Sequence, residues 1–176
     1  YVYKRQDFSK VKILIFEEIY STNRYLSDLE IDKNTLYVCT TEKQNKGKGR
    51  GNKKWESPIG QNIYLSLSFQ LEKNSQLNGF SLMIGLAIRD TLSELYDIDS
   101  KIKWPNDIFF DHKKFCGILI ETKYENNLLK IVIGIGINVF MHSNDQIDQD
   151  WTSLKLIDGE KSFDRNLIIG TVSYTH

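Results

Sequence analysis

Several short stretches of the chain alternate apolar side chains with polar or small ones, which is the period of a β-strand with one buried face. The alternation is clearest at residues 63–69 (IYLSLSF), while residues 12–16 (KILIF) and 36–40 (LYVCT) are runs rich in apolar and β-branched side chains. Four more strands are predicted at residues 101–104, 107–110, 114–122 and 128–135. Turn residues separate these last four strands, so we expect an antiparallel meander.

Helical patterns occur in three other parts of the chain. Residues 77–96 carry side chains at the three-and-four spacing of one helical face. These are Phe80, Met83, Ile84, Ala87, Ile88, Thr91, Leu92 and Leu95. Ser21 provides N-cap chemistry for a shorter helix reaching about Leu29, and a last amphipathic segment begins near Asp164 or Arg165. Together the patterns predict an α+β fold, with a mixed, mostly antiparallel sheet backed by helices.

The composition fits one globular domain of 176 residues. Apolar residues make up 40% and charged residues 26%, which argues against a disordered or fibrous chain. Lys plus Arg number 23, as do Asp plus Glu, so a protein that binds nucleic acid with its whole surface is disfavoured. No apolar stretch is long enough to span a bilayer, and the first residues lack the apolar core of a signal peptide. We therefore expect a cytoplasmic protein without membrane contact.

Cysteine and histidine usage gives no sign of a metal centre. Cys39 and Cys116 lie far apart in runs predicted as strands, where we expect buried free thiols. The three histidines have no metal-ligand spacing, so we predict no structural metal. The two ends, residues 1–6 and 173–176, fit neither the periodicity nor the core pattern beside them, and we interpret them as non-native. One C-terminally truncated domain is therefore expected over residues 7–172.

Residues 43–54 (KQNKGKGRGNKK), here named the basic loop, hold six basic residues and three glycines but no acidic residue. Such a composition does not pack a core, so we expect a mobile loop. Gly47 and Gly49 let backbone amides approach an anion closely. Lys48 and Arg50 beside them can neutralise phosphate or carboxylate. Because the loop lacks the ending of a P-loop, a solvated basic loop and an RNA-binding arm remain open interpretations.

Three further stretches could carry chemistry. Residues 103–107 (KWPND) form a rigid proline turn, where Asn106 and Asp107 could position a nucleotide and its Mg²⁺ or could simply satisfy the turn. Lys114 stands at the entrance of an apolar strand. If its ammonium is fixed, it could hold a carboxylate and phosphoryl oxygens, whereas a side chain that reaches solvent would have no such role. Residues 134–138 (GIGIN) end the last strand, where Gly-x-Gly can mark close packing alone.

Taken in order, these stretches resemble the signature of biotin protein ligases. The matching segments are Ser21-Thr22-Asn23, Gln44, residues 47–69 (GKGRGNKKWESPIGQNIYLSLSF), 103–108 (KWPNDI), 113–121 (KKFCGILIE) and 134–138 (GIGIN). The resemblance covers roughly residues 13–169 and implies the catalytic fold of biotin and lipoate ligases, similar to that of class II aminoacyl-tRNA synthetases. Because no winged helix-turn-helix precedes the first strand, we expect the non-regulatory class, which does not bind DNA.

The resemblance implies a two-step reaction that uses biotin, ATP and Mg²⁺. The biotin carboxylate attacks the α-phosphate of ATP to give biotinyl-5'-adenylate and pyrophosphate, and a lysine of a carrier protein then attacks the mixed anhydride. The implied carrier is a biotin carboxyl carrier protein of acetyl-CoA carboxylase or a related carboxylase. Dimers occur in the family, so a homodimer remains an open expectation.

The matching positions carry the roles that the resemblance implies. The biotin-binding residues would be Ser21, Thr22, Asn23, Gln44, Gly47, Lys48, Gly49, Arg50, Lys114 and Gly117. The residues at ATP or the adenylate would be Arg50, Trp55, Asn106, Asp107 and Asn138, with Asp107 also at the Mg²⁺ ion. Lys114 and Arg50 are expected to act in catalysis, neither of them as a nucleophile. Lys48 stands where the family usually has arginine, which turns a fork-like contact into a point charge.

Two other functions remain open on the sequence. A lipoate or octanoate ligase or transferase would share the fold and one lysine near the acyl carboxylate, although a polar group at residues 21–23 suits a ureido ring better than a dithiolane. A non-catalytic module that binds RNA or other anions through the basic loop belongs to a different class. Salt-dependent RNA affinity without ATP turnover would support that module.

Overall fold

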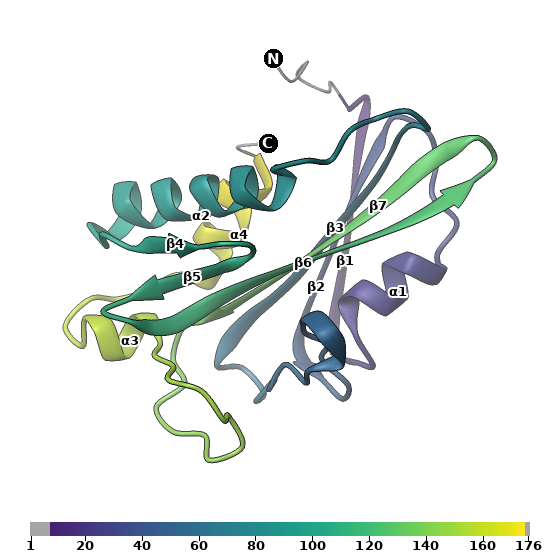
Figure 1. Cartoon of the computed structure of the whole chain (residues 1–176). Coiled ribbons are helices and arrows are strands. Elements are labelled where there is room, and N and C mark those ends of the chain that lie inside the picture. The colour runs from purple at the N-terminus through teal and green to yellow at the C-terminus, as the bar shows by residue number, and fades with distance from the viewer. Residues whose placement is uncertain (1–7, 175–176) are drawn as a thin grey trace.

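Seven strands form one sheet within residues 8–174, the part of the chain that the computed structural model describes (Figure 1). In the order in which they pair, the strands are β1 (Lys10–Ile19), β2 (Thr35–Gln44), β3 (Asn62–Glu72), β7 (Leu128–Asn138), β6 (Lys113–Glu125), β5 (Asp107–Phe110) and β4 (Lys101–Lys103). β1 and β2 run parallel, and the other neighbouring strands of this sheet run antiparallel. The prediction of a mixed, mostly antiparallel sheet is confirmed.

Helices cover both faces of this sheet. They are α1 (Thr22–Asp28), α2 (Phe80–Tyr96), α3 (Leu154–Ile157) and α4 (Arg165–Tyr174), in addition to a 3-10 turn, η1 (Arg50–Asn52). Successive side chains of β2 point to opposite faces. Leu36 and Val38 join the core under α2 and α4, whereas Tyr37 and Cys39 pack with Leu26 of α1. Figure 1 shows α2 and α4 together and α1 at a distance from them, so the expected layer of sheet and helices is confirmed.

Most of the predicted strands extend further than expected, but two elements are shorter than expected at one end. α2 begins at Phe80 rather than at residue 77, because Gly79 before it has a left-handed backbone with a φ of 78°. The strand that follows α2 ends one residue early, at Lys103, since the turn around Pro105 comes next. Both differences lie at the ends of elements, because periodicity locates the middle of an element better than its ends.

The basic loop also differs from expectation. Lys43 and Gln44 were expected to open the loop, but they are the last residues of β2, because β1 continues alongside and pairs with them. Residues 173 and 174 continue α4, and residues 175 and 176 lie outside the described part of the chain, so the interpretation of residues 173–176 as non-native stays a prediction. Residues 1–6 lie outside the described part of the chain, so their interpretation as non-native stays a prediction.

Both cysteines are buried free thiols, as expected, with Cys39 in β2 and Cys116 in β6. Between residues 8 and 174, no group of three or more His, Cys, Asp or Glu side chains could hold a metal ion. No helix in this part of the chain is long and apolar enough to cross a membrane. The residues singled out in the sequence gather at a pocket that the sheet, α1 and the basic loop form together.

Candidate active site

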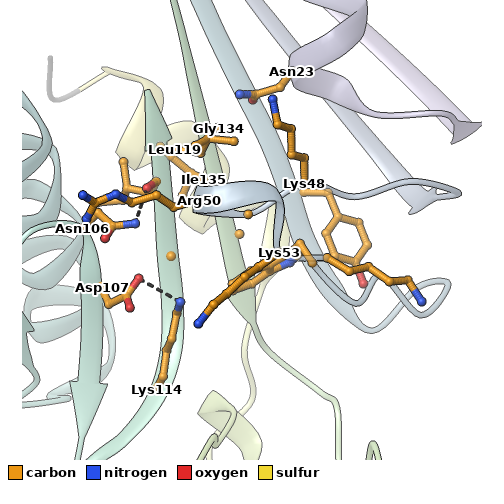
Figure 2. A pocket seen from close by; sticks show the side chains of 18 of the residues that line it. Asn23, Lys48, Arg50, Lys53, Asn106, Asp107, Lys114, Leu119, Gly134 and Ile135 are labelled. Atoms are coloured by element: carbon orange, nitrogen blue, oxygen red, sulfur yellow. Dashed lines mark hydrogen bonds and ion pairs between the residues drawn. The ribbon is translucent and has the colours of Figure 1, made fainter. Parts of the chain in front are cut away.

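A pocket of about 380 Å³ opens where the first turn of α1, the basic loop, and strands β6 and β7 meet. Most of the residues singled out in the sequence line this pocket. They are Ser21, Thr22, Asn23, Gln44, Lys48, Gly49, Arg50, Trp55, Asn106, Asp107, Lys114 and Gly117. Figure 2 shows how side chains from α1, the loop, β5 and β6 converge on this one space.

The start of α1 supplies one polar wall of the pocket. Ser21 caps the helix, and its hydroxyl accepts a hydrogen bond from the Arg24 amide at 3.5 Å. Thr22 donates to Gln44 Oε1 from both its amide, at 3.0 Å, and its hydroxyl, at 3.2 Å. Ser21, Thr22 and Asn23 are buried, so the fold fixes this wall before any ligand binds.

Ser66 of β3 does not line the pocket but supports this wall from behind, and it was not singled out in the sequence. Its Oγ lies 2.7 Å from Thr22 Oγ1 and 2.6 Å from Asn23 Oδ1. A hydroxyl has one hydrogen to donate, so it satisfies only one of these two acceptors at a time. Ser66 pairs with Cys39 and so faces α1. The sequence signal that could have indicated this side chain is the alternation in residues 63–69, because it places Ser66 on the face opposite the core under α2.

Three glycines let other side chains rest directly on the strands below the pocket. A Cβ atom at Gly134 would collide with Asn23 Oδ1, and one at Gly136 would collide with the indole of Trp55. Gly117 is the β6 partner of Gly136, and a Cβ atom there would lie 2.9 Å from Trp55 Cζ3. The close-packing interpretation of the Gly-x-Gly sequence therefore applies to both glycines of β7.

Lys114 is fixed in place rather than extended into solvent. Its Nζ lies 2.8 Å from Asp107 Oδ1 and 5.4 Å from the centre of the Trp55 ring, and its side chain is only 13% exposed. The contact with Asp107 is an ion pair without the alignment of a hydrogen bond, since Oδ1 has no hydrogen-bond partner among the described residues. An anionic ligand could therefore compete with Asp107 for this ammonium.

The turn at residues 103–107 presents Asn106 and Asp107 to the pocket. Asn106 Nδ2 donates to the Ile118 carbonyl at 2.8 Å, so its side chain holds the turn against β6. Asp107 is the one carboxylate among the described residues that line the pocket. One carboxylate suits a Mg²⁺ ion that arrives with nucleotide phosphates and keeps several waters, rather than an ion held by protein ligands alone. The residues thus fit Mg²⁺ as a companion of ATP.

Trp55 separates this pocket from a second hollow of about 310 Å³ and lines both, as does Lys114. The indole nitrogen of Trp55 is buried without a hydrogen-bond partner among the described residues. Buried polar atoms are normally paired, so this nitrogen is a candidate donor to a bound molecule. Asn138 lines the second hollow, and its Nδ2 donates to the Thr152 carbonyl at 3.1 Å.

Residues 47–55, here named the lid, form a small two-armed hairpin. Lys48 and Lys54 pair as an antiparallel bridge, the Gly49 amide donates to the Lys53 carbonyl at 2.7 Å, and Trp55 pairs in the same way with Gly47 at 2.9 Å. Gly47 lines neither hollow. It belongs to one arm of the lid and faces the other arm, where a Cβ atom would collide with the Trp55 carbonyl. Figure 2 shows Arg50 extending from the lid toward Asn106.

Comparison with known proteins identifies the family. Residues 15–138, which include most of the residues that line the pocket, match the model of the Biotin/lipoate A/B protein ligase family. The chain belongs to this family. As a member of the Biotin/lipoate A/B protein ligase family, it is 36% identical over 166 residues to the Bifunctional ligase/repressor BirA of Salmonella typhimurium, an alignment covering 92% of this chain and 51% of that protein.

Solved biotin protein ligases share the fold. The enzyme from Aquifex aeolicus in complex with biotin and ATP superposes with a TM-score of 0.75 and 31% identity, over 92% of this chain and 68% of that one. The enzyme from Leishmania major in complex with biotinyl-5-AMP gives a TM-score of 0.75 and 26% identity, over 92% and 72%. The expected catalytic fold of biotin and lipoate ligases is thereby confirmed. This family member spans about half the length of the curated relatives it matches.

Proposed function

We propose that this chain ligates biotin to a lysine of a carrier protein, with ATP as co-substrate and biotinyl-5'-adenylate as intermediate. The observation that carries the proposal is the lining of the pocket, where an uncharged polar wall faces six cationic side chains and one carboxylate. The cations are Lys48, Arg50, Lys53, Lys54, Lys103 and Lys114. Biotin has the two matching halves, an uncharged ureido ring and a carboxylate that becomes part of an anionic adenylate.

The polar wall suits the ureido ring of biotin. Thr22 Oγ1 and Asn23 Oδ1 both lie within reach of the single hydrogen of the Ser66 hydroxyl, so an oxygen of this wall has room for a further donor. A ureido ring carries two N–H donors and one carbonyl acceptor, and one of its N–H groups would fill that place. A dithiolane ring has no such donor, which favours biotin over lipoate.

In the first step, the biotin carboxylate attacks the α-phosphorus of ATP, and the bond to pyrophosphate breaks. Lys114 would contact the carboxylate and the phosphoryl oxygens, where negative charge accumulates, after leaving its ion pair with Asp107. Asp107 is the residue that would approach the Mg²⁺ ion, which neutralises phosphate charge when bound. Lys114 would thus be released from its ion pair when Asp107 turns to the Mg²⁺ ion.

In the second step, a carrier lysine attacks the acyl carbon of the adenylate, loses a proton, and AMP leaves as the amide forms. The adenylate reacts with water, so it has to be covered until the carrier arrives. Arg50, at the tip of the lid, would hold the adenylate, and closure of the lid would exclude water. A biotin carboxyl carrier protein of acetyl-CoA carboxylase or a related carboxylase is the proposed acceptor.

The contacts of the basic loop weaken the RNA-binding alternative. Lys48 pairs with Glu121 at 2.6 Å and Lys54 pairs with Glu56 at 2.7 Å, so these cations already have acidic partners. The absence of DNA binding, the cytoplasmic location and a homodimer stay predictions.

The testing experiment is biotin-dependent exchange of labelled pyrophosphate into ATP, run beside lipoate and octanoate as competing acids. We expect exchange with biotin alone, which would establish both the adenylation step and its substrate. Exchange with lipoate or octanoate instead would transfer the assignment to the related ligases. Silence with all three acids would contradict adenylation by this chain.

A further inference from the structure

Glu121 of β6 contacts two residues of the pocket without lining the pocket itself. Its Oε1 lies 2.6 Å from Lys48 Nζ of the lid, and its Oε2 accepts a hydrogen bond from Asn23 Nδ2 at 3.0 Å. The carboxylate therefore joins the lid to the polar wall. Neither partner is near it in sequence, and the signature that identified the other residues gave Glu121 no role.

The hydrogen bonds continue from Glu121 through the wall and return to the lid. In order, the residues that lie within hydrogen-bond distance of one another are Lys48, Glu121, Asn23, Ser66, Thr22, Gln44, Ser57 and Trp55, with the Ser66 hydroxyl donating to either Asn23 or Thr22 at any one time. Because Lys48 and Trp55 belong to opposite arms of the lid, both arms are tied to the same wall. A movement of the lid consequently disturbs the side chains that would contact the ureido ring.

The charge of Glu121 sets the orientation of the Asn23 amide. A carboxylate oxygen only accepts hydrogen bonds, so Asn23 must turn its NH₂ group toward Glu121 and its oxygen toward Ser66. Burial by itself raises the pKa of Glu121, but hydrogen bonds from Lys48 and Asn23 outweigh that effect and hold the pKa below its ordinary value. The group is thus ionised at neutral pH and keeps this acceptor role.

Lysine at position 48 is suited to this arrangement. Its ammonium engages Oε1 alone, which leaves Oε2 for Asn23. The planar fork of an arginine can bind both oxygens of one carboxylate and would compete with Asn23 for the second. Lysine at position 48, where the resemblance leads us to expect arginine, therefore leaves one oxygen of the Glu121 carboxylate free to accept from Asn23.

We propose that Glu121 is a positioning residue that latches the lid through Lys48 and fixes the donor and acceptor order of the wall through Asn23. It touches neither the substrate nor the reacting atoms, and its effect on biotin rests on the proposed function. Its effect on the lid does not, because the contact between Glu121 and Lys48 involves residues of the chain alone.

The chain offers a matched control for removing this charge. Glu18 also bridges a lysine and an asparagine amide, with Lys43 Nζ at 3.1 Å and Asn45 Nδ2 at 2.8 Å, but it does so outside the pocket. Glu18→Gln and Glu121→Gln thus make the same chemical change in the same kind of arrangement. Lys48→Met removes the latch from the lid side and leaves Glu121 and Asn23 paired.

Two measurements test the proposal. The first is the rate of tryptic cleavage at residues 50–54 without ligand, where we expect an increase of about fivefold in Glu121→Gln and Lys48→Met, the size of one half-exposed ion pair, and none in Glu18→Gln. The second is the Kd for biotin, measured by calorimetry, where we expect about a tenfold increase in Glu121→Gln. Lys48 also lines the pocket, so Lys48→Met weakens binding by itself, but the part of its effect that depends on Glu121 should disappear when Glu121→Gln is already present.

The outcomes separate the two proposals. Unchanged lid cleavage in both Glu121→Gln and Lys48→Met would overturn the latch, whatever biotin does. Faster lid cleavage in a protein that binds no biotin would support the latch and contradict the proposed function. An unchanged biotin Kd in Glu121→Gln, with tight binding in the wild type, would overturn the role in ordering the wall. If Glu121→Gln does not fold, the cleavage rate of Lys48→Met decides alone.

Discussion

Gly134 shows how one residue without a side chain shapes the site. Its backbone lies so close to Asn23 that a single added carbon would displace the amide oxygen. Gly170, on the exposed side of α4, has nothing within 4 Å of the position where a Cβ atom would be. An added methyl group would therefore collide with Asn23 at position 134 and meet no neighbouring atom at position 170. Composition alone does not distinguish these two glycines.

Gly134→Ala should weaken biotin binding about tenfold and destabilise the fold by about 1–3 kcal/mol, because Asn23 or β7 must shift to make room. Gly170→Ala should leave biotin binding unchanged and stabilise the fold by about 0.5–1 kcal/mol, since alanine loses less backbone entropy than glycine in a helix. Calorimetry and urea unfolding measure the two quantities. Equal effects of the two substitutions would contradict the close packing at Gly134.

Lys114→Ala should lower the rate of biotin-dependent pyrophosphate exchange by about 10² or more while the protein stays folded, because a preorganised charge next to the reacting oxygens is lost. Lys113→Ala is the matched control, because Lys113 is the neighbouring lysine, and its side chain is exposed and does not line the pocket. Exchange at the wild-type rate in Lys114→Ala would remove this residue from the mechanism.

Burial raises the pKa of the Cys39 thiol from 9.0 to about 12. Because the folded pKa is above the unfolded one, this thiol stabilises the fold fully below pH 9, and the contribution is lost as the pH rises toward 12. Between these values, the unfolding free energy should fall more steeply in the wild type than in Cys39→Ala, by at most about 1.4 kcal/mol per pH unit. Urea unfolding at several pH values measures this difference, and parallel curves would contradict it.

At the scale of elements, side-chain periodicity located the middle of every predicted strand and helix, but the composition of the basic loop did not indicate its contacts. The loop was expected to be mobile because six basic residues and three glycines, with no acidic residue among them, do not pack a core. In three dimensions the lid has backbone pairs of its own, and Lys48 meets Glu121, which lies on β6. A local composition cannot reveal such a partner, because only folding brings it near.

Arg50→Gly should release the adenylate before the carrier arrives, because the lid loses the cation at its tip. The expected result is biotinylation of bystander proteins, measured with a mixture of unrelated proteins as acceptors. Lys46→Ala is the control, since this exposed residue of the basic loop precedes the lid and does not line the pocket. Labelling confined to the carrier in Arg50→Gly would contradict the role of Arg50.

At the scale of the whole molecule, the pocket draws on α1, β2, the lid, β5, β6 and β7. A ligand that contacts all of these elements binds only the folded chain. Its binding free energy therefore adds to the stability of the entire fold.

Biotin with ATP, at about 100 times the apparent Kd, should add about 2.7 kcal/mol to the unfolding free energy. For a chain of this size, that is a rise in Tm of roughly 5–10 °C. Thermal unfolding with biotin and ATP, with lipoate and ATP, and with ATP alone measures the effect. A rise with lipoate equal to that with biotin would contradict the preference for a ureido ring.

The sequence alone determined the strands and helices, their arrangement as a sheet backed by helices, and the family, because periodicity, turn residues and ordered motifs are local properties. Most of the residues that it singled out line the pocket. Only the tertiary structure decided that Lys114 is held by Asp107, that Asn138 faces the second hollow, and that Ser66 and Glu121 support the polar wall. Glu121 bonds a residue 98 positions away, and no local pattern encodes a contact that depends on how two strands and a helix pack.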